Sequence, residues 1–298
     1  MKIGFIGLGK MGANMTKRLL LKKHELVVFD FSAEAVKEAT MHGAESAQSI
    51  EELVQKLPQK KVIWLMIPAG KPIDDTLEIL SKTLTKGDII IDGGNSFWKD
   101  SQARAEKMKT FGIDFIDCGT SGGVWGLQNG YCLMYGGNKN ACDYTHDLYK
   151  DLATENGYLY CGESGAGHFV KMVHNGIEYG MMQSFAEGFE LMEESPFAYN
   201  LTDITKLWQH GSVVRSWLLD LIHNALSEDP KLDTIRGYVE DNGEARWMVQ
   251  TAMDLEVPVH ATAASLFTRF ESRQKESFAM KMLAAMRNQF GGHAVKKS

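Results

Sequence analysis

The sequence predicts an α/β domain with a doubly wound, mainly parallel sheet, followed by an all-helical domain. Three observations lead to this fold class. Short apolar segments alternate with amphipathic ones through the first half of the chain, and a glycine-rich turn directly follows the first apolar segment. After Gly162 the strand pattern disappears and apolar residues recur with a helical period. We therefore expect a first domain at residues 1–162 and a second at residues 163–298.

Six strands are expected in the first domain, with amphipathic segments between them. The strands are expected at Lys2–Gly7, Glu25–Asp30, Lys61–Ile67, Asp88–Asp92, Asp114–Cys118 and Tyr131–Tyr135. The helical segments are expected at Met11–Lys23, Ala33–His42, Ile73–Leu84 and Lys99–Phe111. Because a helix separates successive strands, the sheet should be mainly parallel and carry helices on both faces.

The second domain is expected to contain helices only. Its first and longest helix should run from about Ser164 to Glu194, and the last should break near Gln274. The later helices are expected at Leu201–His210, Val214–Leu226, Gly243–Leu255 and Val259–Phe290. Prolines fall between these segments, where a helix ends; they are Pro196, Pro230 and Pro258.

Composition excludes several classes of protein. The chain has 298 residues, of which 44% are apolar and 23% charged, and this is ordinary for a soluble globular protein. The net charge of −6 argues against a general affinity for nucleic acid or anionic membranes. No apolar run is long enough to span a bilayer, and the N-terminus resembles a strand rather than a signal peptide.

Cysteine and histidine usage points to neither a metal nor a disulfide framework. The cysteines are Cys118, Cys132, Cys142 and Cys161, and none forms a Cys-x-x-Cys pair. Their expected role is that of small buried apolar residues in a reducing compartment, so we expect a cytoplasmic protein. The histidines form no ligand cluster, and no metal is expected.

The glycine-rich turn matches the dinucleotide fingerprint G-x-G-x-x-G and predicts a Rossmann-type domain. It follows a predicted strand and opens a predicted helix, which is the required context. Gly7 permits the tight turn, Gly9 lets the backbone approach a pyrophosphate, and Gly12 lets helix and strand pack closely. The expected cofactor contacts are Gly7, Leu8, Gly9, Lys10, Met11 and Gly12. The alternative is a tight strand–helix turn without a ligand.

Asp30 ends the second predicted strand and bears on the choice of cofactor. A carboxylate there can accept hydrogen bonds from the adenosine ribose hydroxyls and would repel a 2′-phosphate. The chain continues as Phe31-Ser32, without an arginine, so NAD is expected rather than NADP. In the alternative, Asp30 only caps the next helix, a role for which Ser32 is an equally good candidate.

The predicted long helix carries five functional side chains on one side. They are Lys171, His174, Asn175, Glu178 and Tyr179. Apolar residues surround them in the sequence, so part of the set should be drawn towards the interior. Polar groups that are costly to bury tend to be kept for chemistry or binding. The alternative is a solvated helix with this spacing by chance.

Two loops place small and hydrogen-bonding residues after predicted strands. They are Asp92-Gly93-Gly94-Asn95-Ser96 and Gly119-Thr120-Ser121-Gly122-Gly123. Open α/β sheets bind ligands at the carboxyl ends of their strands, although in isolation these loops would be only turns. Near the C-terminus, Arg287 and His293 lie in a further polar run.

Taken together, these motifs resemble those of the 6-phosphogluconate dehydrogenase family over nearly the whole chain. The fingerprint glycines, Asp-x-Gly-Asn-Ser, Ser-Gly-Gly, Lys-x-x-His-Asn-x-x-Glu-Tyr and the terminal Arg-x5-His occur in family order. Related β-hydroxyacid dehydrogenases share the fingerprint, the Ser/Thr-Gly-Gly loop and the lysine, but do not normally carry the last two motifs. The chain is similar to the short form of the family, which has a single helical domain.

The resemblance implies oxidative decarboxylation of 6-phospho-D-gluconate to D-ribulose 5-phosphate and CO2, as in the pentose phosphate pathway or gluconate utilisation. It implies that Lys171 is the base and Glu178 the acid that protonates C1 of the enediol. The implied contacts to the substrate's hydroxyls and carboxylate are His174, Asn175, Asn95, Ser121, Gly122 and Gly123, and Asn95 also contacts the cofactor. Taken alone, His174 would be read as a core histidine.

The resemblance also implies a phosphate site and an oligomer. The implied phosphate contacts are Tyr179, Arg246, Arg269 and Arg287. In the family the terminal arginine and histidine reach into the neighbouring subunit's site, which makes Arg287 and His293 contributors in trans. A homodimer or a dimer of dimers is therefore expected. The alternative for Arg287 is a solvated helix end.

Three positions depart from the long forms of the family. Asp30 replaces their polar-basic recognition of the NADP phosphate. Arg246 stands where they usually have lysine, and Trp125 follows the Ser-Gly-Gly loop where they are often acidic and glycine-rich. Two other functions remain open: a dehydrogenase of an unphosphorylated acid such as 3-hydroxyisobutyrate, without decarboxylation, and a non-catalytic nucleotide-sensing scaffold.

Overall fold

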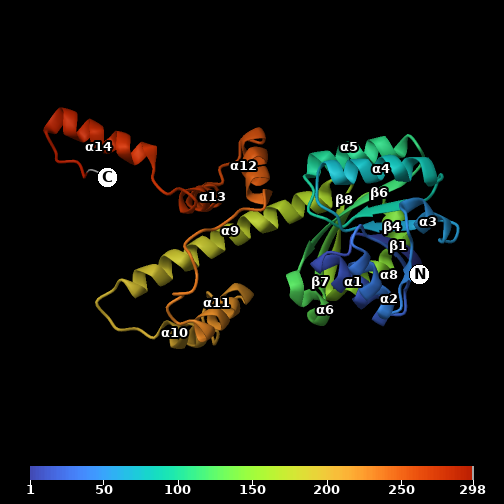
Figure 1. Cartoon of the computed structure of the whole chain (residues 1–298), viewed down its shortest axis with the longest axis horizontal. Helices are drawn as coiled ribbons and strands as arrows, with labels where there is room; N and C mark the ends of the chain where they lie inside the picture. Colours follow the sequence, from blue (N-terminus) through green and yellow to red (C-terminus); the bar gives the residue numbers. More distant parts are fainter. Residues whose placement is uncertain (297–298) are drawn as a thin grey trace. The chain divides into compact units, whose positions relative to one another are not determined.

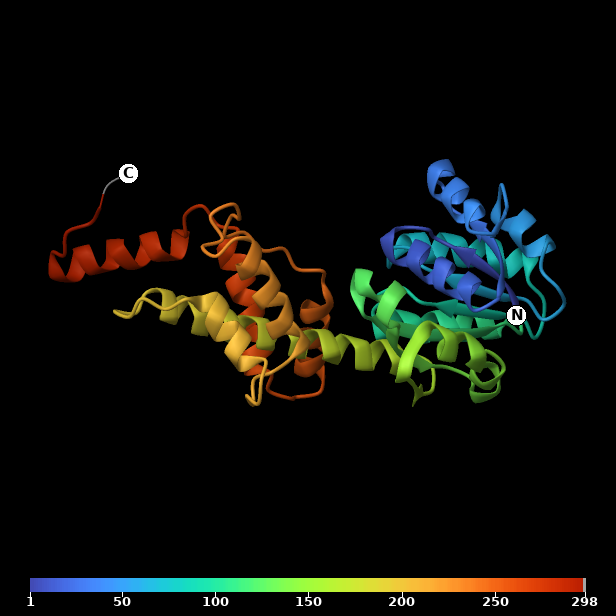
Figure 2. The ribbon, with the colours of Figure 1, turned by 90° about the horizontal axis from the view of Figure 1, so that it is seen from below.

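The structure is a computed structural model and describes residues 1–296. The chain divides into two compact units, Met1–His174 and Asn175–Ser298, which are described separately below. The division falls inside helix α9 (Ala166–Glu193), one uninterrupted helix that is labelled in Figure 1 and runs from yellow-green to yellow in Figure 2. The sequence-based domain boundary after residue 162 lies just before this helix and stays a proposal.

The first unit contains an eight-stranded sheet with the strand order β3-β2-β1-β4-β5-β6-β7-β8. Its strands are β1 (Lys2–Ile6), β2 (Glu25–Phe29), β3 (Glu45–Ser46), β4 (Val62–Leu65), β5 (Ile89–Asp92), β6 (Asp114–Ser121), β7 (Tyr131–Gly136) and β8 (Ala153–Gly162). All neighbours pair in parallel except β6 and β7, which are antiparallel. The predicted mainly parallel sheet is confirmed, with β3 and β8 in addition to the six expected strands.

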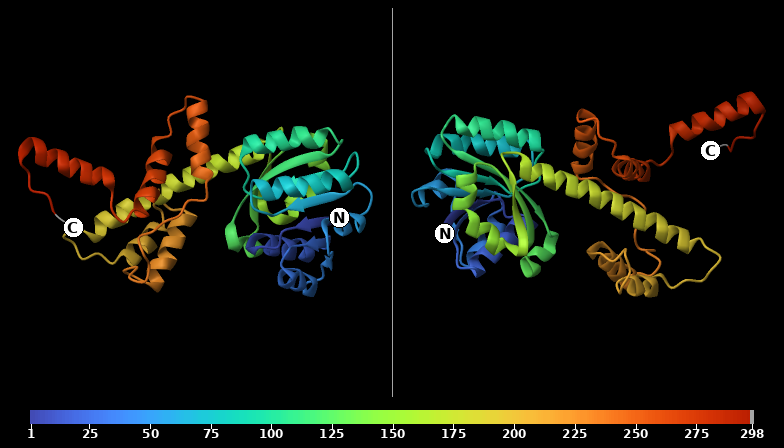
Figure 3. Two further views of the ribbon diagram at one scale, coloured as in Figure 1. Left: turned by 45° about the horizontal axis from the view of Figure 1, so that its top comes forward. Right: turned by 180° about the vertical axis from the view of Figure 1, so that it is seen from behind.

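Helices cover both faces of this sheet (Figures 1 and 3). The elements are α1 (Lys10–Leu21), α2 (Ala33–Met41), α3 (Ile50–Gln55), α4 (Lys71–Thr83), α5 (Trp98–Lys109), the 3-10 turn η1 (Gly123–Trp125), α6 (Gly126–Asn129), α7 (Lys139–Tyr144) and α8 (His146–Leu152). Helices α1, α2, α7 and α8 pack on one face, and α3, α4 and α5 pack on the other.

Alternation along each strand assigns its side chains to the two faces. On β5, Ile89 and Ile91 join the core with α1 and α8, while Ile90 joins the core with α4 and α5. On β4, Trp64 and Leu65 divide in the same way. Because both faces are buried, these strands are continuous apolar runs, and this explains why the sequence revealed them.

The second unit contains helices joined by loops, and no strand, within its described residues, 175–296. After α9 it contains α10 (Leu201–Trp208), α11 (Trp217–Glu228), α12 (Glu244–Asp254), α13 (His260–Ser272) and α14 (Phe278–Gly291). Helix α10 packs against α11, and α12 packs against α13. The expected break near Gln274 is confirmed.

One predicted helix start in this unit is wrong. Helix α11 begins at Trp217 and not at Val214, because the Ser216 hydroxyl accepts a hydrogen bond from the backbone N–H of Leu219 at 3.2 Å and caps the helix there. Ser277 caps α14 in the same way through Met280.

No helix within residues 1–296 is both long enough and apolar enough to cross a bilayer. The same residues contain no group of three or more histidine, cysteine or acidic side chains arranged to hold a metal ion. All four cysteines are free thiols. Cys118 and Cys142 are buried as expected, whereas Cys132 is exposed and Cys161 is half-buried, so the expected burial is wrong for Cys132. Burial raises the pKa of Cys142 to about 12.

Candidate functional site

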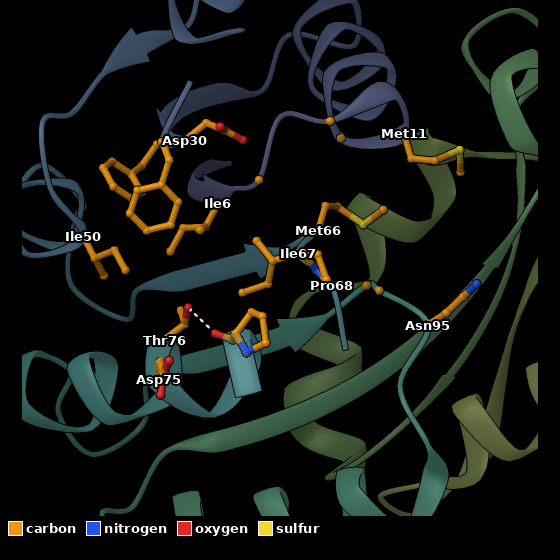
Figure 4. Close-up of a pocket in the computed structure, with 18 of the residues that line it drawn as sticks. Ile6, Met11, Asp30, Ile50, Met66, Ile67, Pro68, Asp75, Thr76 and Asn95 are labelled. Carbon is orange, nitrogen blue, oxygen red and sulfur yellow. Dashed lines mark hydrogen bonds between the residues drawn. The ribbon is translucent and has the colours of Figure 1, made fainter. Parts of the chain in front are cut away.

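A cavity of about 870 Å³ opens at the carboxyl ends of the parallel strands in the first unit (Figure 4). Strands β1 and β4 are neighbours there although β2 and β3 lie between them in sequence, so the strand order reverses at this point. Such a switch point is where open α/β sheets bind ligands. The lining includes residues that follow β1, β2, β4 and β5, in that order Gly7, Asp30, Met66 and Asn95.

The three fingerprint glycines are required for three different reasons. Gly7 has a φ of +97°, and a Cβ there would lie 2.4 Å from the carbonyl oxygen of Met66. A Cβ on Gly12 would lie 2.0 Å from the carbonyl oxygen of Gly7, so only glycine lets α1 start so close to β1. Gly9 faces open space, since a Cβ there would meet no atom within 4 Å, and it leaves the backbone accessible from the cavity.

The N-terminus of α1 is suited to an anion. Among the described residues no side chain caps it, and its first turn contains no acidic residue. The first N–H groups of a helix lack partners within the helix, and the helix dipole favours negative charge at this end. Lys10, Met11 and Gly12 form this turn and line the cavity. The predicted pyrophosphate contacts therefore have suitable geometry.

Asp30 lies at the rim of the cavity and holds the glycine loop. Its Oδ2 accepts a hydrogen bond from the backbone N–H of Leu8 at 2.6 Å, and its Oδ1 accepts one from Ser32 at 2.7 Å. Helix α2 is capped by Ser32, whose hydroxyl accepts from the N–H of Ala35. The cap of α2 is thus a different residue, and Asp30 faces the cavity (Figure 4).

Sequence reasoning missed the apolar part of the cavity. Phe31, Ile50, Ile67, Pro68 and Ile79 line it, and together they form a surface suited to a flat apolar ring. The residues from Met66 to Pro68 come directly after β4, the strand beside β1. Recognising that β4 pairs with β1 would have pointed to them.

The loop after β5 is held by hydrogen bonds to Asp92, which is fully buried. Its Oδ1 accepts from the N–H of Gly94 at 3.2 Å, and its Oδ2 accepts from the hydroxyl of Ser96 at 2.7 Å. The guanidinium of Arg104 approaches the same carboxylate at 3.9 Å. This arrangement fixes the loop and presents Asn95 to the cavity, where its side chain is exposed.

Strand β6 lies against the beginning of α9 through one face. Residues 117, 119 and 121 of the strand share this face, because alternate residues point to the same side. Asp117 contacts His168, Gly119 contacts Lys171, and Ser121 contacts His174. The contacts thus advance by two residues along the strand and by three along the helix, so α9 runs along β6 from residue 168 to 174.

Lys171 is buried and packs closely against strand β6. Lys171 is only 6% exposed, and a Cβ added to Gly119 would lie 2.3 Å from the Cβ of Lys171. One turn further on, the Nε2 of His174 lies 3.3 Å from the hydroxyl of Ser121. Gly122 and Gly123 follow Ser121 with φ values of +131° and +54°, which favour glycine.

The remaining residues of the motif continue along α9. Asn175 is 4% exposed and Tyr179 is 5% exposed, while Glu178 is half-buried. The burial of Lys171, Asn175 and Tyr179 does not agree with a solvated helix. Their side chains occupy the packed side of α9, as the spacing predicts.

Tyr179 and Arg269 form the centre of a basic cluster in the second unit. The tyrosine hydroxyl donates to Oδ1 of Asn242 at 3.0 Å and accepts from the N–H of Asn242 at 3.1 Å. The guanidinium of Arg269 stacks 3.5 Å above the tyrosine ring and donates to the carbonyl oxygen of Glu240. This stacking fixes the plane of the guanidinium.

Arg246 belongs to the same region and is paired with a buried carboxylate. It donates to both oxygens of Asp241, at 2.7 and 2.9 Å, and Arg273 approaches the same carboxylate at 3.1 Å. The hydrogen bonds from Arg246 lower the pKa of Asp241 to about 2. Sequence reasoning missed Arg273, which follows Arg269 by one turn of helical spacing at the end of α13.

Arg287 and His293 lie elsewhere in the second unit. Arg287 is on α14, and His293 follows Gly292, which ends this helix with a φ of +64°. The amide of Asn288 donates to the carbonyl oxygen of His293 at 2.9 Å. The hydrogen bonds and ion pairs described for Arg246 and Arg269 do not include these two residues.

Two family models match the chain almost end to end. Residues 2–162 match the NAD binding domain of 6-phosphogluconate dehydrogenase, and residues 167–284 match the C-terminal domain of 6-phosphogluconate dehydrogenase.

Curated relatives agree with this assignment. The chain is 46% identical to a Bacillus subtilis protein provisionally named as a 6-phosphogluconate dehydrogenase, with all of both chains covered. It is 42% identical to an NAD(+)-dependent, decarboxylating 6-phosphogluconate dehydrogenase of Haloferax volcanii, over 100% of this chain and 99% of the relative. An NADP(+)-dependent, decarboxylating enzyme of Bacillus subtilis is 35% identical, over 92% of this chain and 62% of its own length.

Among solved structures, the 6-phosphogluconate dehydrogenase of Plasmodium falciparum, studied in its apo form and with NADP+ or 6-phosphogluconate, aligns with a TM-score of 0.85 at 27% identity. The alignment covers 100% of this chain and 66% of that one. A 3-hydroxyisobutyrate dehydrogenase of Mycobacterium tuberculosis shares the fold alone, with a TM-score of 0.73 at 20% identity over 89% of this chain and 90% of that one. The family models, the full-length relatives and the matching fold together show that this chain is an enzyme of the 6-phosphogluconate dehydrogenase family.

Proposed function

We propose that the protein oxidises and decarboxylates 6-phospho-D-gluconate to D-ribulose 5-phosphate and CO2, with reduction of NAD. The observation that carries this proposal is the placement of Lys171. Its side chain is buried against the backbone of β6 at Gly119, one turn from the Ser121–His174 pair, in a chain of this family. Burial disfavours the charged form of an amine, so a lysine in this place is suited to act as a base.

The cavity in the first unit fits a nicotinamide dinucleotide. Residues 7–12 would hold the pyrophosphate, Asp30 the adenosine ribose, and Phe31 and Ile67 the flat face of the adenine. When bound, the cofactor supplies a hydride acceptor. The carboxylate of Asp30 supports NAD, because a 2′-phosphate would meet a negative charge beside Leu8. The Haloferax relative is named as NAD(+)-dependent, whereas a Bacillus relative is named as NADP(+)-dependent.

The first step removes two hydrogens from C3 of the substrate. Neutral Lys171 takes the proton of the C3 hydroxyl as the C3 hydride leaves, and C3 becomes a ketone. This ketone is β to the C1 carboxylate. The bond from C1 to C2 can then break, CO2 leaves, and its electron pair is delocalised onto the ketone oxygen, to which Lys171 returns its proton.

The second stage converts the resulting enediol into the product ketose. Glu178 donates a proton to the carbon that becomes C1 of ribulose 5-phosphate, while Lys171 takes the proton of the neighbouring hydroxyl. Lys171 ends protonated and Glu178 ionised, so passage of one proton from the lysine to the glutamate restores both groups. Glu178 is half-buried on α9 and therefore has access to solvent, through which this proton can pass from the lysine.

The remaining site residues would bind and orient the substrate. Asn95, Ser121, Gly122, Gly123, His174 and Asn175 are proposed for its carboxylate and hydroxyls. Tyr179, Arg246 and Arg269 are proposed for its phosphate, because planar guanidinium groups recognise phosphate through paired hydrogen bonds. Arg246 and Arg273 share the carboxylate of Asp241, while Arg269 stacks on Tyr179, so the guanidinium groups outnumber the carboxylate that they pair with, and this excess positive charge supports an anion site.

We also propose a homodimer or a dimer of dimers in which the C-terminal segment completes the neighbouring site with Arg287 and His293. The exposed apolar surface of α14 supports this. Phe278 is 74% exposed and Met280 60%, and Met282, Leu283 and Met286 are also exposed. Such a run of apolar side chains is typical of a contact surface.

The function is tested by following NADH or NADPH formation with 6-phosphogluconate and with unphosphorylated gluconate, while CO2 is measured in the same samples. We expect NAD reduction with one CO2 per NADH, and only with the phosphorylated acid. Reduction without CO2, or equal rates with both acids, would favour a simple hydroxyacid dehydrogenase. A preference for NADP would overturn the argument from Asp30 while leaving the reaction in place.

A further inference from the structure

The start of α9 is held by a carboxylate that the proposed mechanism does not use. Asp117, in the middle of β6, is fully buried. Its Oδ1 accepts from the N–H of Gly165 at 2.6 Å, and its Oδ2 accepts from the N–H of His168 at 2.8 Å. Because α9 begins at Ala166, the N–H of His168 is one of those that the helix itself cannot satisfy. Asp117 therefore fastens the first turn of α9 to the sheet.

Three glycines allow this turn to touch the sheet backbone. A Cβ on Gly167 of α9 would lie 2.6 Å from the carbonyl oxygen of Asp117. A Cβ on Gly136 of β7 would lie 2.9 Å from the nitrogen of Gly167, and one on Gly119 of β6 would lie 2.3 Å from Cβ of Lys171. With no side chain between them, a displacement of the helix start passes directly to Lys171.

A second group of contacts holds the same turn from α5. The Nδ1 of His168 lies 2.7 Å from the hydroxyl of Ser101, and both side chains are buried. The rings of Trp98 and Phe169 also meet edge to face, with centroids 5.4 Å apart. The turn is thus fixed on both sides, and Lys171 follows His168 by three residues on the same helix.

A buried carboxylate is costly, and here burial is the main cause that raises the pKa of Asp117, against its hydrogen bonds to His168 and Gly165. Apolar residues would fill this position in the sheet at lower cost. The carboxylate offers what they lack, two acceptors directed at the helix start and a negative charge at the positive end of the helix dipole.

We infer that Asp117 is a positioning residue: it sets the place of the Lys171 amine by fixing the first turn of α9 on β6. The inference rests on the proposed function in taking Lys171 as the base. A base must lie within hydrogen-bond reach of the proton that it removes, and a misplacement of about 1 Å can cost about a hundredfold in rate. Asp117 contributes through this geometry and does not touch the substrate.

The chain provides a matched control in Asp88. This carboxylate is also buried, and it too accepts two backbone hydrogen bonds, from Lys61 at 2.7 Å and from Thr85 at 2.8 Å. It precedes β5, at the opposite end of the strands from the cavity. Replacing either residue by asparagine keeps the shape of the side chain and removes one of two acceptors. The two variants should therefore lose similar stability.

The experiment compares Asp117→Asn with Asp88→Asn in the full-length enzyme. We expect Asp117→Asn to lower kcat by about a hundredfold, with the KM values for substrate and NAD within about threefold of the parent. The pH profile of kcat/KM should also shift, because the surroundings of Lys171 change. Asp88→Asn should keep kcat and the profile. Equal kcat values and equal profiles in the two variants would overturn the inference and leave Asp117 as a fold-stabilising residue.

Two further measurements separate this inference from its premises. If Asp117→Asn does not fold, Ser101→Ala loosens the same turn from α5 and should lower kcat by about three- to tenfold in the same manner; a parental kcat would contradict the inference.

If the parent enzyme does not oxidise 6-phosphogluconate, the proposed function fails. The positioning role is then tested by labelling with acetic anhydride and mass spectrometry. Lys171 should become more reactive in Asp117→Asn than in Asp88→Asn, and equal labelling would overturn it.

Discussion

The two units of this chain differ in how completely they bury their own apolar surface. In the first unit each strand of the sheet centre is covered on both faces, and two large clusters form the core. In the second unit the buried cluster consists of Tyr179, Ala245 and Leu266, with Val249 and Phe270 packed against it. Large apolar side chains are exposed in both units, but they are more frequent in the helical unit, whose buried cluster is small.

The difference has a simple physical origin. A parallel sheet requires helices on both faces, and the crossover connections supply them within one domain. The helices after α9 have 8 to 14 residues. Helices of this length are marginal alone and depend on the packing of an apolar face. On α14 that face is exposed, so we expect the second unit to need a further surface for its stability.

The largest expected effect is on kcat and concerns Lys171, which belongs to the sheet unit. Lys171→Met should lower kcat by about 10³-fold or more, since general acid–base groups contribute about 10²- to 10⁴-fold. NAD binding, measured by fluorescence titration, should change by less than about threefold, because the cofactor cavity is built from other residues. Lys56→Met, which removes a surface ion pair with Glu52, is the control and should keep full activity. Substantial turnover in Lys171→Met would remove this residue from the role of base.

The second prediction tests whether the exposed apolar face of α14, in the helical unit, is a contact surface between subunits. Leu283→Asp places a charge on the exposed apolar face of α14 and should convert the oligomer to monomers, with loss of most activity if Arg287 and His293 act in trans. The measurement is light scattering after gel filtration. Leu21→Asp changes an exposed leucine of the sheet unit and should leave the oligomer intact. An unchanged oligomer in Leu283→Asp would show that this face is not the contact surface.

A third prediction concerns selectivity within the sheet unit. Asp30→Asn should narrow the preference for NAD over NADP, measured as a ratio of kcat/KM values, by about tenfold, or about 1.4 kcal/mol. The cause is the loss of the negative charge that opposes a 2′-phosphate. Asp75→Asn is the matched control, because Asp75 lines the same cavity but pairs with Lys71. Equal ratios in the parent and Asp30→Asn would show that the carboxylate only shapes the loop.

The smallest expected effect is on the acid stability of the helical unit. The folded pKa of Asp241 is about 2, below the ordinary value of 3.8, so its pairing with Arg246 stabilises the fold above about pH 4. This contribution, about 1–2 kcal/mol after allowance for the exposed Arg246, should be lost as the pH falls towards 2. Thermal unfolding between pH 2 and 5 measures it. Asp241→Asn should lower stability at pH 7 and flatten the dependence, whereas Asp203→Asn, at an exposed carboxylate, should do neither.

Much of the first unit could be predicted from the sequence because its signals are local. The buried strands are continuous apolar runs, and the fingerprint glycines mark a turn whose geometry depends on nearby residues. Strand β3 has only two residues, and β8 is an edge strand with mostly half-buried or exposed side chains, so neither shows a clear pattern. The short helices α3, α6, α7 and α8 were missed for the same reason.

The parts of the site that were missed depend on pairing between distant segments. Met66 reaches the cavity because β4 pairs with β1, and Asp117 and Gly119 contact α9 because β6 lies beneath it. The period of two on β6 was present in the sequence. It became informative only when the structure showed that this face meets residues 168, 171 and 174 of α9.

Because α9 is one continuous helix, the chain tolerates insertions and deletions in some segments and not in others. Each residue of a helix turns the chain by about 100° and advances it by about 1.5 Å. One residue inserted between Lys171 and Tyr179 would therefore turn Tyr179 by about 100° about the helix axis relative to Lys171 and break the spacing of the motif, although no side chain had been replaced. Insertion of a full turn would restore the direction but displace it by about 5 Å along the axis. The length of α9 between the motif residues is therefore constrained, so length variation is expected in the loops between the later helices and not in α9.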